Sequence, residues 1–121
     1  MHPDKKNDIK TFINALIEKL DNDELMAERI DQKEYRIEVK NTFLRYGIAV
    51  RYTPSVNHEV FEEPVCYFQN NQLKFYYMDF TTESEIGMLI QDLIMESNRN
   101  IKRQIIRESD TEFTKLLKLL K

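Results

Sequence analysis

The spacing of apolar residues changes twice along the chain, and this change limits the fold more than any other sequence feature. Over 9–20, apolar residues recur at intervals of three and four, which predicts an amphipathic helix. The same spacing returns from Ile86 onward. Between them lie stretches rich in β-branched and aromatic residues, which are typical of strands. The order predicts an α+β fold with an antiparallel sheet between N-terminal and C-terminal helices.

Three strands are expected, over 48–53, 65–70 and 73–80. Pro54 ends the first, and the acidic stretch that follows, 55–63, is expected to be a loop. Asparagines separate the second strand from the third. Because Asn tolerates the left-handed conformation of tight turns, these two strands are predicted to form an antiparallel hairpin. With 121 residues, the chain is expected to form a single domain, 1–121.

Residues 34–46 fit two patterns. Apolar and charged residues alternate from Tyr35 to Val39, which indicates a strand. A helical spacing of four, four and three links Tyr35, Val39, Phe43 and Tyr46 as well, and Gly47 follows where a glycine commonly ends a helix. We favour the helix, which gives an N-terminal helical pair, and keep the strand as the alternative.

The C-terminal third is predicted to be helical. Thr82 and Glu85 have the spacing of a capping box. The helix that follows either continues through Ile105 or breaks near Ser97, and Asp110 is expected to cap a last helix. The wide apolar arc of that last helix suits core packing, a homo-dimer contact or, least well in an acidic chain, a membrane surface. Its residues are Phe113, Leu116, Leu117 and Leu120.

The net charge of −3 hides an uneven distribution. Acids and bases balance over residues 1–51. Residues 52–98 carry eight acids and one base, whereas residues 99–121 carry three acids and seven bases. An acidic middle segment repels a polyanion and favours a basic partner. We therefore expect a basic protein surface, such as that of an enzyme that handles nucleic acid, as the partner.

The partner-binding surface is predicted in this acidic, aromatic-rich segment, 52–98. Six of the thirteen aromatic residues fall in the predicted hairpin, and tyrosines are effective anchors at protein interfaces. The competing interpretation is a core strand covered by helices. The residues expected to contact the partner are Glu59, Glu62, Glu63, Tyr67, Tyr76, Tyr77, Asp79, Glu83 and Glu85.

The basic C-terminal segment supports an alternative function. A helix over 99–118 would place several cations close together, as in proteins that contact nucleic-acid phosphates. A solvated helix face explains the same pattern. The residues of this alternative nucleic-acid site are Arg99, Lys102, Arg103 and Arg107.

Several chemistries are disfavoured. Gly47 and Gly87 are the only glycines, so the chain contains neither a glycine-rich phosphate loop nor a dinucleotide fingerprint. His2, His58 and Cys66 are too few for a zinc site, and we expect no metal and no cofactor. Cys66 fits a small, half-buried strand residue better than a nucleophile. The chain is therefore not expected to be an enzyme.

A single cysteine makes no internal disulfide, which fits a reducing compartment. No apolar run is long enough to cross a membrane, and a cytoplasmic location is expected. Frequent Lys, Ile and Asn and the absence of Trp are typical of AT-rich coding DNA, as in many phages and mobile elements. The sequence thus predicts a small, non-enzymatic, intracellular protein-binding regulator or inhibitor.

Overall fold

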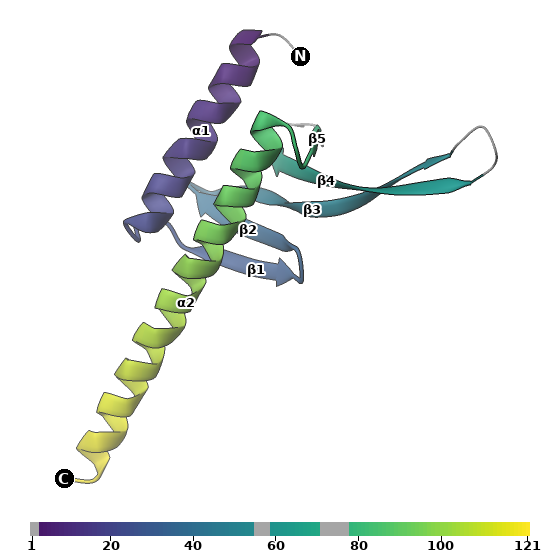
Figure 1. Ribbon diagram of the computed structural model, residues 1–121. Helices are drawn as coiled ribbons and strands as arrows, with labels where there is room; N and C mark the ends of the chain where they lie inside the picture. Colours follow the sequence, from purple (N-terminus) through teal and green to yellow (C-terminus); the bar gives the residue numbers. More distant parts are fainter. Residues whose placement is uncertain (1–2, 55–58, 71–77) are drawn as a thin grey trace.

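The computed structural model describes residues 3–54, 59–70 and 78–121. Two helices and five strands are present among them, and the fold is α+β. The elements are α1 (Pro3–Asp21), β1 (Ala27–Asp31), β2 (Glu34–Val39), β3 (Thr42–Pro54), β4 (Val60–Asn70), β5 (Met78–Thr81) and α2 (Glu85–Leu119). The strands form one antiparallel sheet in the order β1-β2-β3-β4-β5. Both helices lie on the same side of this sheet, next to each other (Figure 1).

The core lies between the sheet and the two helices. The apolar stripe predicted for the first helix is confirmed, because its members Ile13, Leu16 and Leu20 are buried. The stripe predicted from Ile86 onward supplies the facing side of the core. The remaining buried residues of this cluster are Ala27, Tyr35, Ile37, Leu44, Tyr46, Cys66, Ile90 and Leu93.

The helix favoured over 34–46 is wrong, and so are the N-terminal helical pair and the three-stranded sheet. This segment forms β2 and the start of β3, joined by a turn at Lys40 and Asn41, whose φ angles of 48° and 68° are left-handed. Pairing Tyr35 with Tyr46 and Ile37 with Leu44 buries all four side chains on one face. A helix would not place these four residues on one face. The segment therefore forms strands, because only strands bury the alternating apolar side chains together.

Gly47 does not end a helix but lies within β3, where the backbone of Lys33 approaches closely. A Cβ at this position would lie 2.1 Å from the Lys33 carbonyl oxygen. That oxygen accepts a hydrogen bond of 3.1 Å from the backbone N–H of Ile48. Only a residue without a side chain permits this contact.

The other strand predictions are partly right. The predicted strands 48–53 and 65–70 are parts of the longer β3 and β4, which pair from Leu44↔Asn70 to Pro54↔Val60. The expected loop 55–63 is too long, since β4 begins at Val60. Within 73–80 the structure describes only 78–80, which belong to β5. The predicted turn around Asn71 and residues 73–77 lie outside the described residues.

One long helix replaces the separate C-terminal helices. The helix α2 runs unbroken past Ser97 and Asp110. Its N-cap is Ser84 and not Thr82, because the Ser84 hydroxyl accepts a 3.0 Å hydrogen bond from the backbone N–H of Gly87. The predicted boundary was therefore two residues early.

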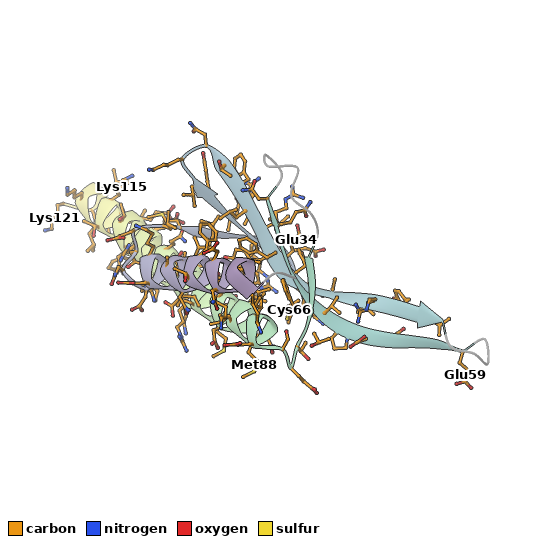
Figure 2. All side chains as sticks on the ribbon, turned by 90° about the horizontal axis from the view of Figure 1, so that it is seen from above. Glu34, Glu59, Cys66, Met88, Lys115 and Lys121 are labelled. Carbon is orange, nitrogen blue, oxygen red and sulfur yellow. The ribbon has the colours of Figure 1, made fainter. Side chains whose placement is uncertain are left out.

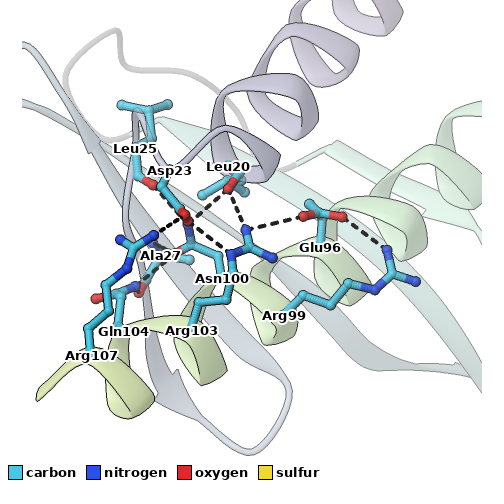
Figure 3. A network of polar contacts seen from close by, with 10 residues as sticks. All are labelled: Leu20, Asp23, Leu25, Ala27, Glu96, Arg99, Asn100, Arg103, Gln104 and Arg107. Atoms are coloured by element: carbon cyan, nitrogen blue, oxygen red, sulfur yellow. Dashed lines mark hydrogen bonds and ion pairs between the residues drawn. The ribbon is translucent and has the colours of Figure 1, made fainter. Parts of the chain in front are cut away.

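A buried asparagine joins the two helices to the sheet (Figure 3). The Asn100 amide nitrogen donates to the backbone carbonyls of Leu20 and Leu25, each at 3.0 Å. Its amide oxygen accepts from the Ala27 backbone N–H at 2.9 Å and from the Gln104 side chain at 2.7 Å. One fully buried side chain of α2 thereby forms hydrogen bonds with backbone groups at the end of α1, in the connection after it and at the start of β1.

We expect Asn100→Ala to lower the free energy of unfolding by about 3 kcal/mol, because the substitution leaves buried backbone groups without partners. Urea denaturation followed by circular dichroism measures this change. Asn22→Ala, at the exposed residue that follows α1, is the matched control and should change stability by less than about 0.5 kcal/mol. Equal effects of the two substitutions would show that the Asn100 hydrogen bonds are not important.

Candidate interaction surfaces

The β3–β4 arm, defined here as residues 50–54 of β3 with 60–64 of β4 and Glu59 just before it, projects away from the helices (Figures 1 and 2). The neighbouring strands do not extend along it: β2 pairs with β3 only up to Gly47, and β5 pairs with β4 only from Val65. In the described part of the chain, the arm is therefore a two-stranded ribbon with no further strand on either edge.

One face of the arm is apolar and exposed. Val50 is opposite Pro64, and Tyr52 is opposite Glu62, so these four side chains share a face. Tyr52 is 63% exposed and Val50 is 47% exposed. Val60, near the tip, is 62% exposed. Because these large apolar side chains lie on a projecting ribbon, they do not stabilise the fold by packing in the core.

The arm is also acidic. Arg51 and Glu63 form an ion pair of 2.7 Å across the strands on the second face. Glu59 and Glu62 are exposed, and Figure 2 shows Glu59 at the tip, the point of the arm farthest from the helices. These three predicted site residues therefore lie together on one projecting element.

The remaining predicted partner-binding residues do not join this group. Tyr67 is only 6% exposed and belongs to the buried part of the sheet. Asp79 lies in β5, where its backbone pairs with Tyr67. Tyr76 and Tyr77 lie outside the described residues. The described members thus do not form one continuous surface.

The last two predicted acids lie at the start of α2. Glu83 is exposed just before the helix. Glu85, in its first turn, pairs with Lys10 at 2.7 Å and with Lys6 at 3.4 Å. The hydrogen bond and charge of Lys10, followed by those of Lys6, lower the pKa of Glu85. Glu85 therefore contributes to the contact between the two helices.

Tyr52, Val50 and Val60 are exposed residues of the arm that were not predicted as site residues. The alternation over 48–52 was recognised as a strand, and the strand prediction holds. What the sequence lacked was evidence that this part of the strand leaves the core. The exposure of Tyr52 follows from the different lengths of neighbouring strands, which the alternating pattern does not encode.

Three of the four predicted phosphate-binding cations form ion pairs within the protein. Arg103 binds Asp23 at 3.1 Å and lies 3.5 Å from Glu96. Arg107 pairs with the second carboxylate oxygen of Asp23, and Arg99 pairs with Glu96 at 3.0 Å (Figure 3). Lys102, the fourth cation, is exposed. The arginines thus neutralise carboxylates of this chain.

Asp23 is the acceptor of two of these pairs. Partial burial acts to raise the pKa of its carboxyl, but the hydrogen bonds and charges of Arg103 and Arg107 outweigh this effect and hold the pKa below its ordinary value. The backbone of Asp23 is left-handed, with φ 58°. The carboxylate therefore fixes the turn after α1 to the middle of α2.

The C-terminal half of α2 extends beyond the sheet (Figure 1). Every residue from 105 to 121 is exposed. The predicted homo-dimer residues are all on this segment: Phe113 is 62%, Leu116 58%, Leu117 45% and Leu120 85% exposed. Among the described residues, core packing, one of the three interpretations of this apolar arc, does not occur.

Little in the described residues suggests catalysis. Cys66 is buried, and burial raises the pKa of its thiol; His58 lies outside the described residues. The described residues hold no group of three or more potential metal-ligating side chains. Nor does any described helix have the length and apolar character required to cross a membrane.

One hollow, of 330 Å³, lies between the two helices near the start of α2. Its charged residues include Lys10 and Glu85, which bind each other. The lining residues are Lys10, Asn14, Glu85, Met88, Leu89 and Asp92. The set contains neither a histidine nor a hydroxyl or thiol side chain.

Comparison with known protein families, with curated proteins and with solved structures finds no match for this chain. The function proposed below is therefore argued from the geometry of the described residues.

We expect the free energy of unfolding to decrease as the pH falls below about 4, because the unfolded chain binds a proton at Asp23 before the folded protein does. In Asp23→Asn this part of the pH dependence is absent, and stability near neutral pH is lower. Urea denaturation at pH 3 to 7 measures both effects, with the exposed Asp21→Asn as control. A wild-type pH dependence in Asp23→Asn would contradict the assignment.

Proposed function

We propose that this protein is a small, non-enzymatic, intracellular protein-binding regulator or inhibitor that docks on a basic partner surface through its β3–β4 arm. The observation that carries the proposal is the arm itself, which holds Tyr52 and Val60 exposed beside Glu59 and Glu62. A tyrosine and aliphatic residues surrounded by acids match the composition of an interface that binds basic proteins.

The shape of the arm supports docking. A two-stranded ribbon that projects from the rest of the molecule enters a groove or cleft that a rounded surface does not reach (Figure 1). Tyr52 and Val60 would supply the apolar contact. The carboxylates of Glu59 and Glu62 would favour association with a cationic cleft, such as one that receives nucleic acid. An arm in such a cleft blocks the natural substrate, which is how a protein without catalytic groups inhibits an enzyme.

The alternative is a nucleic-acid-binding regulator that uses the basic part of α2. Lys102 is exposed, and Lys115, Lys118 and Lys121 follow on the exposed end of the helix. The ion pairs of Arg103 and Arg107 with Asp23 disfavour this alternative, because a phosphate that binds either arginine would have to replace an existing ion pair. The arm therefore supports the protein-binding function better than the helix supports the alternative.

We expect Glu59→Lys/Glu62→Lys to weaken binding of the partner by about 100-fold, because two attractions become repulsions on an element that the core does not need. Tyr52→Ala should weaken binding by about tenfold. The tagged full chain is used to isolate a partner from cells of its natural host, and the dissociation constant is then measured with the purified partner by calorimetry in low and high salt.

The matched control is Glu18→Lys/Asp21→Lys, which changes the net charge equally on the exposed face of α1 and should bind as the wild type does. A partner that binds the arm variant as tightly as it binds the wild type would contradict the proposal that the arm is the binding surface. A gel shift with DNA or RNA at low salt that is lost in Lys102→Glu and kept in the arm variant would establish the alternative instead.

A further inference from the structure

A second hollow, of 260 Å³, lies on the side of the sheet opposite the helices (Figure 1). Tyr35 and Tyr46 point into the core, so their neighbours Glu34 and Arg45 point to the other face. The hollow is smaller than the pockets of about 300–1,000 Å³ that hold drug-sized molecules, and it suits a ligand of the size of one amino acid. The first four strands and the first turn supply its lining residues, Asp31, Lys33, Glu34, Arg45, Ile48, Ala49, Tyr67 and Gln69.

Arg45 lines this hollow without a hydrogen-bonded acceptor among the described residues. Its Nε is buried and has no partner there, and its Nη1 lies 3.8 Å from Oε1 of Glu34, too far for a hydrogen bond. Arg36 lies opposite Arg45 on β2. Arg36 differs, because it pairs with Glu28 and its guanidinium carbon lies 4.8 Å from the centre of the Phe43 ring. Arg45 therefore retains the donors that a ligand needs.

The charges of the lining are separated along the hollow. Arg45 and Gln69 are opposite each other on β3 and β4, and they supply donors at one end. Asp31 and Glu34 are opposite each other on β1 and β2, and they supply carboxylates at the other end. Lys33, in the turn that joins those two strands, brings the formal charge of the lining to zero. A simple anion would meet the carboxylates and a simple cation would meet the arginine, so the lining favours a ligand that carries both charges.

An α-amino acid carries both charges on one carbon atom. Its planar carboxylate matches the fork of a guanidinium, and its ammonium is a donor that carboxylates accept. A ligand of this kind bridges the 3.8 Å between Nη1 of Arg45 and Oε1 of Glu34, which do not reach each other. Because Nε of Arg45 is buried whereas its side chain is 40% exposed, the two terminal nitrogens are the ones that the ligand contacts.

We propose that this hollow binds a free α-amino acid, whose carboxylate contacts Arg45 and whose ammonium contacts Glu34 and Asp31. Tyr67, which is only 6% exposed, forms with Ala49 the uncharged part of the lining against which the side chain of the ligand packs. The site lies outside the β3–β4 arm, and the proposal does not depend on the function of the arm.

NMR titration of the ¹⁵N-labelled full chain with each of the common amino acids tests the proposal. We expect at least one of them to shift the amide signals around Glu34 and Arg45, with a dissociation constant of about 1 mM or lower. Its α-amide, which lacks the carboxylate, and its N-acetyl derivative, which lacks the ammonium, should each bind at least about tenfold more weakly. This comparison uses the unaltered protein, so it does not depend on the folding of any variant.

Two substitutions locate the ligand. Arg45→Gln and Glu34→Gln should each raise the dissociation constant by about tenfold or more, because each removes one of the charged contacts. The matched controls are Arg51→Gln and Glu63→Gln, which change an arginine and a glutamate that pair with each other on the arm and should leave the binding unchanged.

Three results would overturn the proposal. The first is the absence of any shift with every amino acid at about 10 mM. The second is an N-acetyl derivative that binds as tightly as its amino acid, because this would establish a simple anion site instead. The third is binding that persists in both Arg45→Gln and Glu34→Gln, because this would place the ligand elsewhere on the molecule.

Discussion

The hydrogen bonds of Asn100 join the end of α1, the connection after it and the start of β1 inside the core. This side chain is fully buried in α2 and bonds to the last turn of α1, to the connection that follows and to the first residue of β1. A buried amide with every group satisfied is stabilising only in one arrangement of its neighbours. Asn100 therefore fixes how the chain passes from the end of α1 into β1, and how α2 is placed against α1 and β1.

The arginines around it extend this arrangement to the surface. Arg103 donates to the carbonyl of Leu20 at 2.7 Å and to Asp23, and Arg107 binds Asp23 from the next turn. The same region of α2 buries Ser97, whose hydroxyl hydrogen-bonds to Tyr46 in β3. Charges that resemble a phosphate-binding site in the sequence thus stabilise the junction of helices and sheet.

This junction also determines which surfaces are left open. With the core centred on the first half of α2, the second half extends into solvent with its apolar stripe uncovered. At the other end, β3 and β4 are longer than the strands beside them, and the excess length becomes the arm. The arm and the exposed end of α2 therefore have one origin, since each is an element that continues past the shared core.

The sequence alone determined the amphipathic helices, the strands around Ile48 and Cys66 and the α+β class, because periodicity reports directly which side of an element is buried. It did not determine 34–46, where alternating and helical spacings coexist and only pairing with neighbouring strands buries Tyr35 and Tyr46 together. It also grouped Glu59, Tyr67 and Glu85 by proximity along the chain. The tertiary structure separated them into the arm, the core and the contact between helices. Exposure depends on where neighbouring elements stop, and that depends on contacts between residues far apart in the sequence.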